Sequence, residues 1–190
     1  MKRVEPADIL SLASYDEQRD GLRQLALEVK KPRRIHVAGV LTFLFENPFT
    51  VRYQIQEMLR AERITRESDV LQEIETYNEL LGQGGELGCT LLIELTDPEE
   101  RREKLTLWRD LPERLYLRME DGSLVRPRFD ERQRGELRLS SVQYLKFDVG
   151  GTVPVAAGVD LPDLRDETPL TSEQRRALAE DLGVSSVPAR

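Results

Sequence analysis

The chain has 190 residues, enough to bury the core of one domain without disulfide or metal staples. Charged residues make up 33% of it and its net charge is −7, which argues against a nucleic-acid or anionic-membrane partner. With one cysteine and one histidine, the chain cannot form an internal disulfide, a Cys/His zinc site or a four-cysteine iron–sulfur site by itself. We therefore expect a cytoplasmic protein.

Helical periodicity and end signals predict several helices. Ser14 to Glu17 has the form of a capping box, and Asn47-Pro48 and Asp97-Pro98 are typical helix starts. We expect helices over residues 14–30 and 50–64, from 68 to about 81, from 97 to about 111, and a short one from 171.

Alternating apolar residues predict the strands of the fold. They lie at 33–39, 41–47, 89–95, 115–119, 124–129 and 141–149. Pro127 predicts that the fifth of these strands lies at a sheet edge, because proline cannot donate a ladder hydrogen bond. The strands come in hairpin-like groups, which favours an α+β fold: a mostly antiparallel sheet of about five to six strands with helices packed mainly on one face.

The pattern weakens after Gly150. We therefore assign residues 1–150 to a single α+β domain and residues 151–190 to a weakly structured C-terminal extension that carries the short helix from 171. The last six residues, SSVPAR, are expected to fray.

The sequence lacks the common cofactor and nucleophile motifs, including G-x-G-x-x-G, the Walker loop and G-x-S-x-G. The glycines of LGQGGELG precede a strand and are best interpreted as a connector. His36 falls in a predicted strand and favours a structural role. Cys89 shares a strand face with Leu91 and Ile93, so we expect a buried, unreactive thiol.

Four glutamates could in principle supply oxygen ligands to a metal: Glu46, Glu57, Glu62 and Glu73. Helical carboxylate di-iron sites normally combine such residues with Glu-x-x-His pairs, and the only histidine is His36. We predict no metal and no cofactor.

The segment TVRYQIQEMLRAERI (50–64) is the densest in chemistry. On a helical wheel its apolar arc holds Val51, Ile55, Met58 and Leu59. The opposite arc holds the candidate binding residues Arg52, Gln56, Arg60 and Arg63, flanked by Tyr53 and Glu57. Guanidinium groups in a line suit the binding of oxyanions or of an acidic partner. The alternative is a solvated face with weak ion pairs.

Glu62 lies inside the apolar arc of the same wheel. A carboxylate in that position must be paired, for which Arg33 or Arg34 are candidates, or protonated as an acid–base group, or placed at a helix end open to water. The sequence leaves these alternatives open.

Three stretches together resemble a bacterial family of unknown function: FENPFTVRYQIQEMLRAERI (45–64), EIETYNELL (73–81) and CTLLIEL (89–95). The resemblance extends from about Asp8 to Asp148, and YQIQEMLR-x-ER is its specific part. It implies a cytoplasmic protein with no established activity, cofactor or catalytic residue. Members of that family are often encoded near rubrerythrin-like and heterodisulfide-reductase-like iron–sulfur proteins, which implies an accessory role in redox chemistry or peroxide defence with such a protein as partner.

Two functional hypotheses follow. The first is a binding or accessory protein that uses the arginine-rich helix face. The second is an enzyme on a small anionic substrate, in which arginines hold the substrate and Tyr53, Glu57 or Glu62 move protons. A cavity that encloses Tyr53, Glu57 and Arg60 would favour the enzyme.

Overall fold

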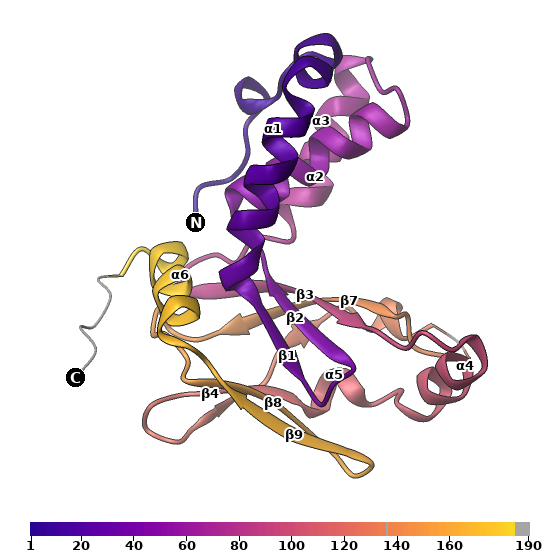
Figure 1. The fold of residues 1–190 in the computed structure, drawn as a ribbon, viewed down its shortest axis with the longest axis vertical. Helices are drawn as coiled ribbons and strands as arrows, with labels where there is room; N and C mark the ends of the chain where they lie inside the picture. Colours follow the sequence, from indigo (N-terminus) through magenta and orange to yellow (C-terminus); the bar gives the residue numbers. More distant parts are fainter. Residues whose placement is uncertain (136, 185–190) are drawn as a thin grey trace.

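Three helices stand on a body of two β-sheets in the structure, a computed structural model that describes residues 1–135 and 137–184 (Figure 1). The helical layer consists of α1 (Leu12–Lys30), α2 (Pro48–Ala61) and α3 (Glu67–Asn78). Shorter helices are η1 (Pro6–Asp8), η2 (Lys31–Arg33), α4 (Pro98–Leu107), α5 (Leu111–Arg114), η3 (Glu131–Arg134) and α6 (Ser172–Leu182). The predicted α+β class is confirmed.

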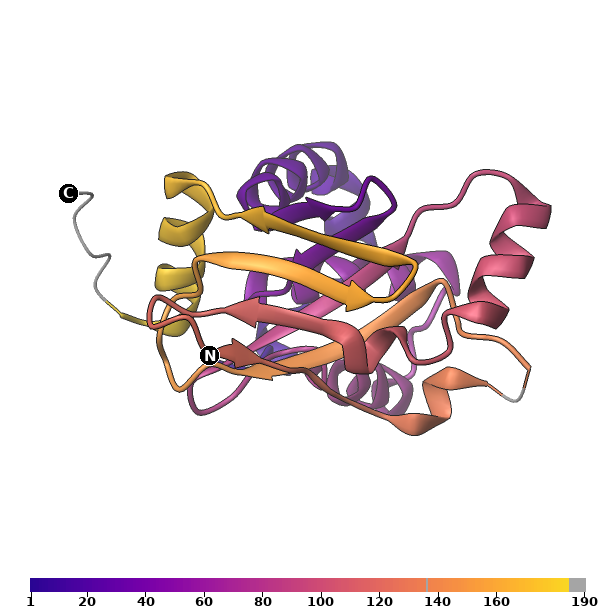
Figure 2. The ribbon, with the colours of Figure 1, turned by 90° about the horizontal axis from the view of Figure 1, so that it is seen from below.

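All strands pair antiparallel, in two sheets where the sequence predicted one. The first sheet has the order β1 (Arg34–Val37), β2 (Leu41–Phe45), β3 (Glu86–Ile93), β7 (Val142–Asp148) and β6 (Arg128–Phe129). The second has the order β5 (Leu124–Val125), β4 (Leu115–Arg118), β8 (Ala156–Leu161) and β9 (Leu164–Pro169). Figure 2 shows the second sheet lying across the first. Their facing sides bury the main core, which includes Phe43, Leu91, Phe147, Leu117 and Val159.

The predicted strand 124–129 is divided between the two sheets. Its first part, β5, pairs with β4, whereas its second part, β6, pairs with β7. Pro127 lies between them and has no N–H to donate, so the ladder cannot continue through it. The chain crosses from one sheet to the other at this point.

The prediction of a weakly structured C-terminal extension is wrong for residues 156–182, which form β8, β9 and α6. β8 is missing from the sequence prediction because both of its faces are covered. Five of its six residues are buried, which erases the alternation that marks a half-exposed strand. The helix predicted from 171 is confirmed, with Thr171 and Gln174 forming its capping box. The SSVPAR segment lies outside the described residues.

Several helix boundaries differ from the prediction. α3 ends at Asn78 rather than near 81, and α4 ends at Leu107 rather than near 111. α1 begins at Leu12, because the hydroxyl of Ser11 accepts the N–H of Ser14 and caps the helix. α2 begins at Pro48, where the side chain of Asn47 accepts the N–H of Thr50, and it ends at Ala61. Glu62 and Arg63 therefore lie beyond the helix.

The outer edge of β1 is covered by side chains. The hydroxyl of Thr168 donates to the carbonyl of His36 at 2.7 Å, and the amide of Gln174 donates to the carbonyl of Arg34 at 2.7 Å. The backbone N–H of Ala38 donates to the carboxylate of Asp166 at 2.7 Å. β9 and α6 thus satisfy backbone groups that an open edge strand would offer to another chain.

The connection between α3 and β3 approaches the strand very closely. A Cβ atom on Gly88 would lie 1.8 Å from the carbonyl oxygen of Leu80, and one on Gly82 would lie 2.2 Å from that of Glu86. Only glycine fits at such distances. This contact fixes the lower end of α3 against the first sheet.

A buried ion pair joins the helical layer, the sheets and α6. Arg33 donates from Nε and Nη2 to the carboxylate of Asp181 at 2.8 and 2.9 Å, and its Nη1 donates to the carbonyl of Val29 at 2.8 Å. The amide of Asn47 also donates to Asp181, at 3.3 Å. Both charged side chains are less than a tenth exposed. In Figure 1, α6 lies beside the point where α1 ends and β1 begins.

Replacing Asp181 by alanine leaves the Arg33 guanidinium buried without its partner. We expect Asp181→Ala to lower the free energy of unfolding by about 3–5 kcal/mol, measured by urea denaturation. The double variant Arg33→Met/Asp181→Leu removes both charges and is expected to lose less. Arg132→Ala, which removes an exposed ion pair with Asp130, serves as control and should cost less than about 1 kcal/mol. Equal losses for Asp181→Ala and the control would contradict a structural role for the buried pair.

Candidate functional site

The α1–α2 face is the surface where these two helices meet, and it contains most of the residues that the sequence singled out. The apolar arc of α2 packs inward: Val51, Ile55 and Leu59 are buried. Across from α2, the residues Tyr15, Arg19 and Arg23 lie four positions apart on α1, so they form one row along that helix. The two helices bring this row next to Tyr53 and Glu57.

Glu57 is held by two side chains of α1. Arg19 donates to both of its oxygens at 2.8 Å, and the hydroxyl of Tyr15 donates to Oε1 at 2.6 Å. The hydrogen bond from Arg19 is the main reason why the pKa of Glu57 is lowered, while burial and the bond to Glu57 raise the pKa of Tyr15 well above its ordinary value. At neutral pH the carboxylate is therefore ionised and the phenol protonated.

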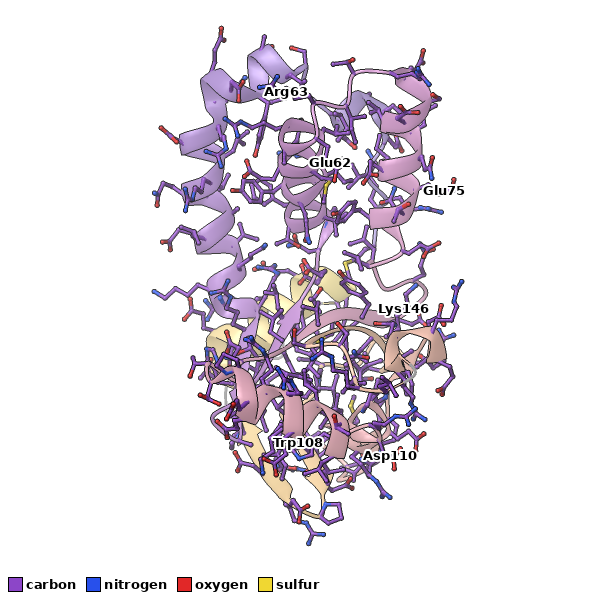
Figure 3. The ribbon with its side chains drawn as sticks, turned by 90° about the vertical axis from the view of Figure 1, so that its right-hand side faces the viewer. Glu62, Arg63, Glu75, Trp108, Asp110 and Lys146 are labelled. Carbon is purple, nitrogen blue, oxygen red and sulfur yellow. The ribbon has the colours of Figure 1, made fainter. Side chains whose placement is uncertain are left out.

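The structure separates the four predicted binding residues. Gln56 is buried, and its amide binds the backbone of Leu10: the N–H of Leu10 donates to Oε1 at 2.6 Å, and Nε2 donates to the carbonyl at 3.3 Å. Arg60 pairs with Asp16 on α1 at 2.5 Å. Arg63 follows the helix, with a φ of 54°, and lies at the end of the helical layer far from the sheets (Figure 3). A helical wheel predicts the direction in which each side chain of α2 points. It does not predict that Leu10, in the segment before α1, covers one face of α2.

Arg52 is the predicted binding residue that remains available on the α1–α2 face, whereas Arg63 is exposed away from it. Its guanidinium lies 5.3 Å from the centre of the Phe49 ring. Arg52, Tyr53 and Phe49 line a small cavity of about 140 Å³, which Gln18 and Leu22 of α1 also border. Neither Glu57 nor Arg60 borders this cavity.

Cations surround Tyr53. The Nζ of Lys30 lies 5.9 Å from the centre of its ring. Burial raises the pKa of Tyr53, as does the charge of Glu57, while the nearby Arg19 and Arg23 oppose that rise. We call Arg23, Lys30 and Arg52 the cationic patch. Within residues 1–135 and 137–184, none of these three cations has a carboxylate oxygen within 4.0 Å.

Glu62 is exposed at the end of α2. Of the alternatives that the sequence left open, it is therefore the carboxylate at a helix end open to water. Arg33, one of its candidate partners, binds Asp181 instead. Of the three candidate catalytic residues, Tyr53 and Glu57 thus lie on the α1–α2 face, and Glu62 lies away from it.

Sequence reasoning missed the contribution of α1 to this face. Tyr15, Arg19 and Arg23 are absent from the prediction, although a row of one tyrosine and two arginines at spacing four is a visible signal on a predicted helix. Lys30 belongs to the basic run 30–34, which the sequence favours as a charged helix end. The row on α1 can be recognised in the sequence, but the packing of α1 against α2 cannot be predicted from it.

His36 and Cys89 both occupy structural positions. The Nδ1 atom of the exposed His36 forms a hydrogen bond with the hydroxyl of Thr42, at 2.8 Å. Cys89 is buried, and burial, followed by the charge of Glu46, raises the pKa of its thiol. Over residues 1–135 and 137–184, no three His, Cys, Asp or Glu side chains group in a way that could hold a metal ion. In the same ranges, no helix combines the length and apolarity required to cross a membrane.

Fold and site together define an α+β protein with a three-helix layer on two antiparallel sheets, whose polar α1–α2 face is built from ion pairs and tyrosines. The chain belongs to the family described as protein of unknown function (DUF3501), whose model matches residues 3–182. It is also similar to the crystal structure of a novel protein of unknown function from Burkholderia pseudomallei K96243. The two are 27% identical, with a TM-score of 0.86 over 97% of this chain and 100% of the other. The comparison with curated proteins gave no match.

Loss of the Glu57 charge should destabilise the α1–α2 packing. We expect Glu57→Gln to lower the free energy of unfolding at neutral pH by about 1.5–3 kcal/mol, because a charge-assisted hydrogen bond to Arg19 is lost. The folded-state pKa of Glu57 lies below its ordinary 4.5, so the ionised carboxylate stabilises the fold above that pH. This contribution is lost as the pH falls through the lowered pKa, and the difference between the two proteins should shrink in acid.

Urea denaturation at neutral and acidic pH measures both effects. Glu75→Gln on α3 is the control, since Glu75 is exposed and projects from the outer side of its helix (Figure 3). A difference between Glu57→Gln and wild type that stays constant as the pH is lowered would contradict the role of the ionised carboxylate.

Proposed function

We propose that this chain is a cytoplasmic binding or accessory protein without catalysis of its own, and that its working surface is the cationic patch of Arg23, Lys30 and Arg52. The observation that carries the proposal is the difference between the cations on this face. Arg19 and Arg60 are each bound to a carboxylate, whereas no carboxylate oxygen of the described residues lies within 4.0 Å of a patch cation, although Asp8 borders the cavity beside Arg52. Cations left in this state attract an anion from outside the chain.

The patch suits a carboxylate or phosphate group presented by a larger partner. The adjoining cavity of about 140 Å³ has room for such a group but not for a drug-sized ligand. Arg52 at its border offers the planar fork that binds oxyanions through two parallel hydrogen bonds. An acidic partner would also be oriented by the patch on a protein whose overall charge is negative.

The alternative function, an enzyme acting on a small anion, receives less support. Its candidate base, Glu57, already accepts three hydrogen bonds and does not border the cavity. A general base needs an oxygen within reach of the substrate and a pKa near the working pH. The lowered pKa of Glu57 moves it away from that range.

The resemblance to proteins encoded near rubrerythrin-like and heterodisulfide-reductase-like iron–sulfur proteins supplies the candidate partner class. We propose that an acidic surface of such a redox protein docks on the cationic patch. The predicted binding residues are revised accordingly: Arg52 is retained, Arg23 and Lys30 are added, and Gln56 and Arg60 are assigned to holding the helices together.

Binding of a purified rubrerythrin-like protein from the same organism tests this proposal. We expect Arg23→Ala/Arg52→Ala to weaken the complex about tenfold at low salt, mainly through slower association, because charged groups at an interface rim steer the encounter. Added salt should reduce the difference. Surface plasmon resonance at several salt concentrations measures affinity and rates.

Arg102→Ala on α4 is the matched control, because it removes an exposed arginine on a helix outside the helical layer. Circular dichroism verifies that each variant is folded. Unchanged binding of the double variant relative to Arg102→Ala would rule out the cationic patch as the docking surface.

A further inference from the structure

A second and larger cavity lies where α3 meets the outer edge of the first sheet. Its volume is about 720 Å³, within the range of cavities that hold small-molecule ligands. Glu73 and Tyr77 of α3 form one wall with Glu79, which follows the helix, and Tyr144 and Lys146 of β7 belong to the opposite one. Figure 3 shows Lys146 beside the lower end of α3, on the side of the molecule away from α1.

The two walls carry opposite charges. The carboxylates of Glu73 and Glu79 lie on the α3 side. The sheet side has the cations of Lys146 and Arg128 together with the carboxylate of Asp130, which is paired with Arg132. Arg128 is paired with Glu86, at the start of β3. Within the described ranges, Lys146, Glu73 and Glu79 form no ion pair shorter than 4.0 Å, with each other or with any other side chain. Among the described residues, Lys146 on the sheet side and the glutamates on the α3 side therefore border the same cavity without forming an ion pair with each other.

Aromatic side chains lie between the charged walls. Tyr77 and Tyr144 come from the two sides, with Phe129 nearby on β6. They are close enough to influence each other: burial raises the pKa of Tyr77, and so do the charges of Glu73, Tyr144 and Glu62. Glu62, exposed at the end of α2, thus acts on Tyr77 through its charge without bordering the cavity.

The sheet side of the cavity is held in place before any ligand arrives. The side chain of Gln133 binds the backbone of Tyr144 as a neighbouring strand would, accepting its N–H at 2.6 Å and donating to its carbonyl at 3.1 Å. Lys146 stands opposite Arg128 in the β6–β7 pair. A wall fixed by such bonds requires little ordering when a ligand binds.

We propose that this cavity binds a short zwitterionic peptide or amino-acid derivative, with its ammonium group toward Glu73, its carboxylate toward Lys146 and an apolar side chain between Tyr77 and Tyr144. A singly charged ligand would satisfy one wall and leave the charge of the other without compensation. A zwitterion compensates both, and its apolar part covers the tyrosine rings. The site is separate from the cationic patch and does not depend on it.

The probe is the tripeptide alanyl-phenylalanyl-alanine in three separate forms: with both ends free, with only the N-terminus acetylated, and with only the C-terminus amidated. Titration into the full-length isotope-labelled protein, followed by NMR, reports binding through the backbone amide signals of Tyr77, Tyr144 and Lys146. We expect saturable shifts with the free peptide and an affinity about tenfold lower for each blocked form, equal to about 1.4 kcal/mol for one lost ionic contact.

Two variants assign the ends of the peptide. Lys146→Glu should weaken the free peptide but leave the C-amidated form nearly unchanged, and Glu73→Gln should weaken the free peptide but not the N-acetylated form. Lys2→Glu makes the same charge change on an exposed N-terminal residue and should have no effect. Absence of saturable shifts, equal binding of free and blocked peptides, or equal effects of Lys146→Glu on the free and amidated forms would overturn the proposal.

Discussion

The ion pair of Arg33 and Asp181 is the constraint on which the arrangement of the helices over the sheets depends. Arg33 ends the chain segment that leads from α1 into β1, and Asp181 stands near the end of α6. Asn47, the cap of α2, binds the same carboxylate. The directions of α1 and α2 relative to the first sheet are therefore fixed at one buried point. The two residues of the ion pair that meet there are 148 residues apart in the sequence.

A buried charge pair is not stabilising by default, because desolvation of both ions opposes the attraction between them. Here the guanidinium also donates to the carbonyl of Val29, and the carboxylate also accepts from Asn47, so both ions have additional polar partners. The consequence is specificity of position. Apolar contacts alone would let α6 slide on the body, whereas a bidentate pair allows one placement.

Much of the local structure could be predicted, and the reasons are visible in particular residues. β1 alternates between buried and exposed residues, β2 is a short, mostly apolar run and α2 has helical periodicity. Asp97 and Thr171 mark the starts of α4 and α6 by side-chain capping. β8 could not be predicted, because it is buried on both faces and begins with Ala156, Ala157 and Gly158, which favour strands less than the large apolar residues of β2 do. Neither could the sheet switch at Pro127, since proline indicates a break but not the direction the chain takes afterwards.

The candidate site was predictable in its residue types but not in their partners. The wheel correctly placed Val51, Ile55 and Leu59 inward. It could not indicate that the segment before α1 lies across α2 and engages Gln56, or that Asp16 meets Arg60. Tertiary contacts between segments more than 40 residues apart decide which polar side chains are free, and a single helix carries no information on them.

The covered edge of β1 has a consequence for the order in which the chain folds. α1, α2 and α3 precede β3 in the chain, and most of the hydrogen bonds that join them to one another lie within residues 4–78, so they can pair before the later strands are made. β1 is synthesised before the residues that protect its edge, because Asp166, Thr168 and Gln174 follow their partners by 128, 132 and 140 residues. Until they are made, the outer edge of β1 has unpaired backbone groups, which another chain can bind.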